Sequence, residues 1–269
     1  QGSMDSMKRL ARVHLKHIQG EPFNKEDLEF LYEMKGTIKS TGYGRDPRIV
    51  ELRAKRNLED DMSVIFECSK NQIAKTPQEI NKNTKAYLGK LAPGISDLIQ
   101  EYNVEHIYTS FPEEKIILEK NFENSPITLG EFEKKTKQYN KAIRDKSLKT
   151  KLTDYSKDMI QKKEFATLKA IETMTLIRLK ISSLFADEKT HTTEEIYERA
   201  EALGFELCPP ETGPNYRLKY KDQPLGEWFL IGMKQITDRD GYPDVFGLAR
   251  FGGGLWLHGP LAPPERSWD

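Results

Sequence analysis

The hydrophobic pattern of the chain changes near residue 190, and this change limits what the sequence can fold into. Up to about Ala186, apolar residues recur mostly at helical spacing. After about Thr190, short apolar and aromatic runs alternate with glycine-rich turns, which is typical of strands. The pattern predicts the α+β class. We expect a mostly helical domain over residues 4–185 and an α+β module, one helix packed on an antiparallel sheet, over residues 190–269.

Several helix-start signals occur in the predicted helical domain. Asn24 can cap a helix, with Asp27 at the position that completes a capping box. Asp46 can cap another, because Pro47 suits the first turn of a helix. The apolar spacing of residues 128–185 predicts two or three more helices.

The predicted C-terminal module has its own start and turn signals. Thr192 or Thr193 can cap a helix that ends at Gly204. Residues 216–220 (YRLKY) alternate between apolar and polar as a strand does. Residues 236–260 contain an Asp-Gly turn and a Gly-Gly-Gly turn between apolar runs, which predicts a three-strand antiparallel meander.

Charge and composition argue against several classes of protein. Lysine and arginine total 42, as do aspartate and glutamate, so the chain lacks the basic field of a typical nucleic-acid binder. No stretch approaches the ~18 apolar residues of a membrane span, so we expect no membrane partner. Cys68 and Cys208 lie far apart, which predicts a reducing, cytoplasmic location. Without a nucleotide-binding or metal-binding motif, we expect no cofactor.

Four segments of the chain form a specific pattern: EHIYTSFPEEKI, TTEEIYERAEALGFELCPPETGPNYRLKY, QPLGEWFLIGMKQITDRDGYPDVF and GLWL. They resemble a family of uncharacterised bacterial proteins from uncultured lineages, and the likeness extends from about Asn24 onward. This resemblance implies no activity, substrate or cofactor. It implies one more apolar strand after Asp269, so we expect this chain to stop short of that strand. Residues 1–3 are expected to be the remnant of a cleaved tag.

Asp238, Asp240 and Asp244 are the first candidates for chemistry. Two of them stand at alternate positions before a glycine, as in a calcium-binding loop, but no glutamate follows at the twelfth position. We therefore expect a structural turn, and keep the three aspartates as weak candidates for a metal site or a metal-assisted hydrolase. His258 could form an acid–base pair with Asp238 or Asp240, although an ordinary surface role is expected more often.

A lysine-rich segment raises the alternative of nucleic-acid binding. Residues 134–163, which begin with Lys134, Lys135 and Lys137, hold ten lysines and one arginine against three aspartates. Cations along a helix displace counterions from phosphate and so favour binding to nucleic acid. The flanking glutamates and the near absence of arginine favour a solvated helical face instead.

All three tryptophans lie in the predicted C-terminal module. Most aromatic residues there are expected to fill the core of the sheet. Trp256 and Trp268 stand near glycine-rich or terminal positions, which makes them candidate binding residues. We therefore predict a non-catalytic interaction or ligand-recognition protein that binds an unidentified protein or small ligand, with no catalytic residue assigned. Nucleic-acid binding and metal-assisted hydrolysis are the alternatives.

Overall fold

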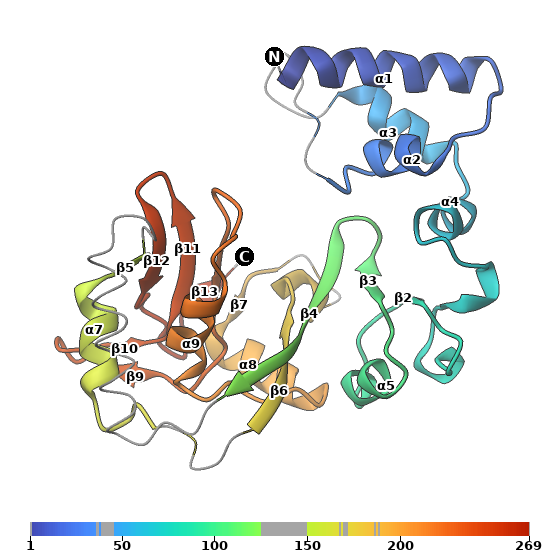
Figure 1. Ribbon diagram of the computed structural model, residues 1–269. Helices are drawn as coiled ribbons and strands as arrows, with labels where there is room; N and C mark the ends of the chain where they lie inside the picture. The colour runs from blue at the N-terminus through green and yellow to red at the C-terminus, as the bar shows by residue number, and fades with distance from the viewer. Residues whose placement is uncertain are drawn as a thin grey trace. The chain divides into compact units, whose positions relative to one another are not determined.

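The fold is of the α+β class and divides into two compact units, Gln1–Ile117 and Leu118–Asp269 (Figure 1). This computed structural model describes residues 2–35, 38, 46–124, 150–166, 168, 172–185, 187 and 189–268. The boundary between the units differs from the predicted one near residues 185–190. The first unit contains strands as well as helices, so the prediction of a mainly helical N-terminal domain is not confirmed.

The described part of the first unit contains five α-helices, and three of them begin after a capping side chain, at Asn24, Asp46 and Asn57. The five helices are α1 (Gly2–Ile18), α2 (Lys25–Leu31), α3 (Pro47–Ala54), α4 (Leu58–Ile65) and α5 (Ile95–Glu101). Asn24 Oδ1 accepts the Asp27 N–H at 2.9 Å, and Asp46 Oδ1 accepts the Arg48 N–H at 3.0 Å, so both predicted caps are confirmed. In the described part of the chain, no helix has the length and apolar character needed to cross a membrane.

The described residues also include a five-stranded sheet. Its strand order is β1-β2-β3-β4-β6, where β1 is Ile73–Ala74, β2 is Ala86–Leu88, β3 is His106–Ser110, β4 is Glu114–Asn124 and β6 is Glu172–Arg178. The first three strands pair in parallel, and β4 returns antiparallel to β3. Helix α5 lies between β2 and β3 in sequence, as a parallel pair needs a crossover connection. The boundary between the two units falls within β4.

A buried ion pair in the first unit involves Asp61 on α4. Its two carboxylate oxygens accept N–H groups of Arg56, both at 2.6 Å, and its Oδ2 also accepts the Tyr32 hydroxyl at 2.8 Å. Asp61 is only 2% exposed. Because Tyr32 follows α2, the Asp61 carboxylate links α2 to α4 as well as neutralising Arg56.

The second unit is built on a four-stranded sheet of order β5-β12-β11-β8. These strands are β5 (Thr150–Leu152), β8 (Trp228–Leu230), β11 (Gly247–Phe251) and β12 (Gly254–His258). Two smaller pairs join β9 (Ile236–Thr237) to β10 (Pro243–Asp244) and β7 (His191–Thr192) to β13 (Ser267–Trp268). The helices are α7 (Asp154–Gln161), α8 (Thr193–Ala202) and α9 (Thr212–Lys219); α7 and α9 pack against β12 (Figure 1).

Two predicted elements have the opposite secondary structure. Residues 172–178, predicted as helix, form strand β6, since alternate β-branched residues such as Thr175 and Ile177 suit a sheet that already contains β4. Residues 216–220, predicted as strand, lie at the end of α9 and just after it. Tyr216 and Tyr220 stack there with ring centroids 5.4 Å apart, because residues four positions apart lie on the same face of a helix.

Residues 236–260 form two separate hairpins instead of a three-strand meander. Strands β9 and β10 form a two-stranded sheet of their own, whereas β11 pairs with β12 across a tight turn at Gly252-Gly253. In the larger sheet, Leu248 lies opposite Leu257 and Phe229, and this row contributes to the core of the second unit. The predicted helix at Thr192 is confirmed, with a capping box between Thr192 and Glu195.

Candidate functional site

The turn between β9 and β10 is organised by Asp238. Its Oδ1 accepts the backbone N–H groups of Asp240 and Tyr242, both at 2.8 Å. Its own N–H donates to the Tyr242 carbonyl at 2.8 Å. Gly241 has a φ of +88°, which glycine adopts without strain. The expected Asp-Gly turn is therefore present, and it fixes the buried Asp238 side chain in one orientation.

Asp244 lies at the end of β10, beside the chain that follows β12. The Val245 N–H donates to the Pro260 carbonyl at 3.2 Å, and Asp244 forms an antiparallel bridge with Leu261. This pairing leaves Asp244 only 1% exposed. Its Oδ2 has no hydrogen-bond partner within the part of the chain that the structure describes. A buried carboxyl oxygen without a donor costs free energy, and a donor supplied from outside the described residues would remove that cost.

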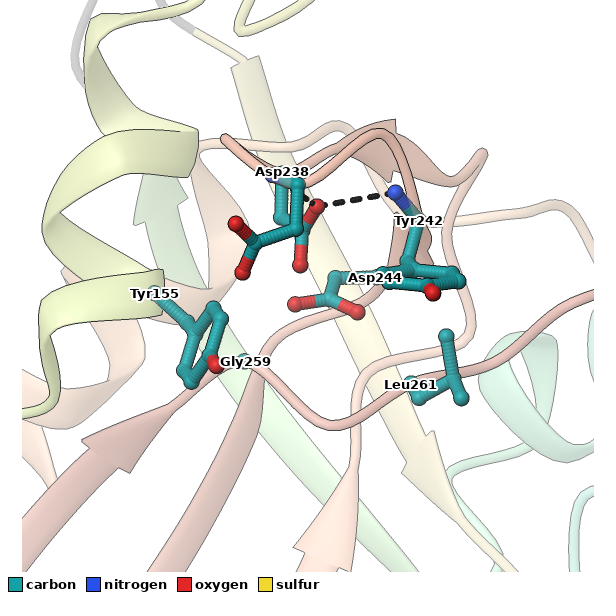
Figure 2. Close-up of a pocket in the computed structure, with 7 residues that line it drawn as sticks. Tyr155, Asp238, Tyr242, Asp244, Gly259 and Leu261 are labelled. Carbon is teal, nitrogen blue, oxygen red and sulfur yellow. Dashed lines mark hydrogen bonds between the residues drawn. The ribbon is translucent and has the colours of Figure 1, made fainter.

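The two carboxyl groups face a cavity of about 260 Å³. Figure 2 shows that Asp238 and Asp244 point into the same space, with the Tyr155 ring from α7 on one side and Leu261 on the other. The residues that line this cavity are Tyr155, Asp238, Asp240, Tyr242, Asp244, Gly259 and Leu261. Within the part of the chain that the structure describes, the lining includes three acidic side chains and no basic one. Asp238 and Asp244 are buried, whereas Asp240 is exposed.

Two basic side chains lie around the cavity without lining it. Lys162 Nζ donates to the backbone carbonyl of Asp238 at 3.1 Å. The Arg239 guanidinium lies 5.2 Å from the centre of the Tyr155 ring, and its Nε is 3.4 Å from Asp158 Oδ2. Both cations therefore have other partners, and neither donates a hydrogen bond to Asp244.

The surroundings of Asp244 change its acidity. Burial, together with the smaller effect of the negative charge of Asp238, raises the pKa of the Asp244 carboxyl to about 7. A carboxyl group that titrates near neutral pH can give up a proton when a positive group approaches. It can also act as a general acid or base toward a bound molecule.

The three aspartates do not form a metal-ligand set. Among the residues that the structure describes, no group of three or more histidine, cysteine, aspartate or glutamate side chains could hold a metal ion. Asp238, Asp240 and Asp244 line one cavity, but Asp238 already uses Oδ1 for two backbone N–H groups. The cavity therefore brings these predicted residues together without completing a coordination shell.

His258 does not line the cavity. It lies on β12 opposite Gly247, and a Cβ placed on Gly247 would come within 2.6 Å of the imidazole Nε2. Burial lowers the pKa of His258. The proposed acid–base pair of His258 with Asp238 or Asp240 is therefore not supported by this arrangement.

The two candidate tryptophans lie away from the cavity and are partly buried. The Lys151 ammonium lies 4.9 Å from the Trp256 ring centre. The Trp268 indole N–H donates to Thr193 Oγ1 at 2.8 Å, so it is used to attach β13 to the start of α8. The more exposed tryptophan is Trp228, at 57%. Sequence position alone therefore did not identify which indole faces solvent.

The lysines predicted to bind nucleic acid lie largely beyond the described structure. Lys134, Lys135 and Lys137 fall outside the described residues. Within residues 134–163, the described part begins at Thr150 and includes helix α7. Nucleic-acid binding by this segment therefore stays a prediction.

Three residues of the cavity were not anticipated from the sequence: Tyr155, Gly259 and Leu261. Tyr155 comes from α7, far from the β9–β10 turn in the chain. Gly259 and Leu261 follow β12 and reach the cavity because this segment pairs with β10. No local sequence signal marks such residues, although Gly259 adjoins the predicted His258.

Gly259 allows α7 and Asp244 to approach each other closely. A Cβ on this residue would lie 2.7 Å from Met159 Sδ, 3.2 Å from Asp244 Oδ2 and 3.3 Å from the Tyr155 Cβ. The first distance is too short for a real contact, so an alanine would force the buried Met159 side chain on α7 to shift.

We expect Gly259→Ala to lower the free energy of unfolding by about 1–3 kcal/mol, as overpacking typically does. The measurement is denaturant unfolding followed by tryptophan fluorescence, because all three tryptophans lie in the second unit. The control is Gly252→Ala, since a Cβ there would meet no atom within 4 Å. Equal unfolding midpoints for the two variants would contradict the close approach.

Comparison of the chain with protein-family models, curated proteins and solved structures gave no match.

Proposed function

We propose that the second unit is a ligand-recognition module, and that it binds a small molecule in the cavity lined by Asp238 and Asp244. The observation that carries this proposal concerns Asp244, a residue that lines the cavity: its Oδ2 atom is buried and has no hydrogen-bond partner among the described residues. A bound hydrogen-bond donor would satisfy it.

The energetic argument concerns the unpaired carboxyl oxygen. A buried acceptor without a donor costs about 1–3 kcal/mol, and more when the group is charged. Among the described residues none donates a hydrogen bond to Asp244 Oδ2, while Gly259 lets the chain pass close to this carboxyl group. The unpaired oxygen raises the free energy of the free protein. A ligand that supplies the missing donor removes this cost, which contributes to its affinity.

The size and charge of the cavity favour a small ligand over a macromolecule. Its volume of about 260 Å³ suits a compact molecule or a single side-chain-sized group. Its acidic lining would repel the phosphates of a nucleic acid. We therefore keep the function predicted from the sequence, ligand recognition without catalysis. We assign it to the residues of this cavity and not to Trp256 and Trp268.

The test is a protein-observed NMR screen of the full chain with small molecules that include amines, alcohols, amides, carboxylates and phosphates. We expect at least one class to shift the amide signals of Asp240 and Tyr242, because these N–H groups bond to Asp238. Binding should be at least tenfold weaker in Asp244→Asn and unchanged in the control Asp222→Asn, which removes an exposed carboxyl elsewhere in the second unit. If no class shifts these signals, or if Asp244→Asn binds as the native chain does, the proposed function is wrong.

A second candidate function is an enzyme that uses Asp244 as a general acid or base. The observation that favours it is the pKa of Asp244, which burial raises to about 7, the range in which proton transfer at neutral pH is most efficient. The two functions differ in turnover. A ligand found in the screen that is converted to product by the native chain, but not by Asp244→Asn, would favour the enzyme.

A further inference from the structure

The charge distribution around the cavity narrows the class of ligand, provided that the cavity binds a small molecule as proposed above. Its described lining residues include the carboxyl groups of Asp238, Asp240 and Asp244, and none of those residues is a lysine, arginine or histidine. We propose that the ligand is a small organic cation that carries an ammonium group, and that this group lies between the carboxyl groups of Asp238 and Asp244.

The hydrogen-bonding capacity of the two carboxylates supports this assignment. An ionised carboxylate only accepts hydrogen bonds, and Asp244 Oδ2 is a buried acceptor without a donor. Asp238 commits Oδ1 to two backbone N–H groups, and its other oxygen, Oδ2, makes neither of these bonds. An ammonium group offers three donors and a positive charge, so it can satisfy both carboxylates at once. A neutral alcohol offers one donor and leaves the charges uncompensated.

The protein does not neutralise the cavity by itself. Lys162 approaches the hairpin but donates to the Asp238 carbonyl, and Arg239 stacks near the Tyr155 ring. Tyr155 and Tyr242 both line the cavity, and aromatic faces attract organic cations. A hydrated metal ion gains less from these surroundings, since no metal-ligand set of three side chains occurs among the described residues.

Binding of the cation should be coupled to a proton. When Asp244 is protonated, the approaching ammonium replaces the carboxyl proton, which leaves to solvent, and the resulting carboxylate pairs with the cation. Because burial raises the pKa of Asp244 to about 7, most molecules carry this proton at pH 6 and must lose it on binding, whereas few carry it at pH 8. We therefore expect binding to be about tenfold weaker at pH 6 than at pH 8.

Several charged groups surround Asp244 and bear on this pH dependence. Asp238 acts on it directly and favours its protonated form. On the same hairpin lie Asp240 and Arg239, and α7 and the residue after it add Asp158 and Lys162. His258, the last residue of β12, adjoins the lining residue Gly259, and burial lowers the pKa of this histidine. The Asp244→Asn variant separates the contribution of Asp244 from all of these.

The experiment titrates the full chain with three molecules of matched shape, n-butylammonium, n-butanol and butyrate, at pH 6 and pH 8, and with calcium chloride alone. The amide signals of Asp240 and Tyr242 report binding. We expect n-butylammonium to bind at least tenfold more tightly than n-butanol at pH 8, with no saturable effect of butyrate. Asp244→Asn should lose this preference and the pH dependence, and Asp222→Asn should keep both.

The outcomes separate this inference from the proposed function. If n-butanol or butyrate binds as tightly as n-butylammonium, the cavity is a ligand site but the charge assignment is wrong. If calcium saturates the same signals at lower concentration than n-butylammonium, the cavity prefers a metal ion and the inference is also wrong. If none of the four binds, the inference fails, and the broader screen then decides the proposed function separately.

Discussion

Replacing Asp61 by alanine is expected to destabilise the first unit by about 3–5 kcal/mol, the usual cost of breaking a buried ion pair by removing one partner. The substitution leaves the Arg56 guanidinium without its two carboxylate contacts and the Tyr32 hydroxyl without its acceptor. Both groups would remain in buried surroundings, because Asp61 is only 2% exposed in the native chain. The contact between α2 and α4 would therefore weaken at the same time.

Hydrogen–deuterium exchange of peptides from α2 and α4 is the measurement, because the first unit contains no tryptophan to report its unfolding. The native chain and Asp61→Ala should differ in protection by several hundredfold. The matched control is the neighbouring Asp60→Ala. Asp60 pairs with Lys70 at the surface, with more than half of each side chain exposed, and such pairs contribute little. Equal protection in the two variants would show that the ion pair is not important for stability.

The stability of the second unit is expected to fall as pH rises from 5 to 8, and Asp244→Asn should remove most of this dependence. Burial raises the pKa of Asp244 from its ordinary value of 3.8 to about 7 in the folded chain. Between these values the folded state binds more protons than the unfolded state, so the free energy of unfolding decreases with rising pH. A shift of this size corresponds to at most about 4 kcal/mol, fully lost above the folded-state pKa.

Denaturant unfolding followed by tryptophan fluorescence at pH 5 and pH 8 tests this dependence. The native chain should lose about 2–3 kcal/mol more than Asp244→Asn across this range, since asparagine carries no charge at either pH. Contributions from histidines are common to both chains and cancel in the comparison. Asp222→Asn, which removes an exposed carboxyl from the same unit, should behave as the native chain does. Parallel pH profiles for all three chains would mean that Asp244 titrates in its ordinary range.

The prediction from sequence was most successful for features that depend on neighbouring residues. The caps at Asn24, Asp46 and Thr192 involve bonds to backbone groups within three positions, and all three are confirmed. The α+β class followed from the change in pattern near residue 190, and it is also confirmed. These signals are local, so the rest of the fold can change little about them.

The predictions for short segments with ambiguous patterns were wrong. Residues 172–178, predicted as helix from their apolar spacing, form a strand, and residues 216–220, predicted as strand from their alternation, lie in α9 and just after it. A pattern of so few residues does not outweigh their tertiary neighbours. Where the first unit ends also depends on contacts made by β6, far along the chain from β4. Periodicity within a short window carries no information about such partners.

For the candidate site, the sequence by itself determined the Asp-Gly turn and the presence of three acidic side chains near it. Only the tertiary structure decided that Asp238 and Asp244 are buried while Asp240 is exposed, and that Tyr155 and Gly259 complete the cavity. The reason is physical. A turn forms through hydrogen bonds between residues a few positions apart, whereas the desolvation that raises the pKa of Asp244 requires atoms from α7 and from the chain after β12.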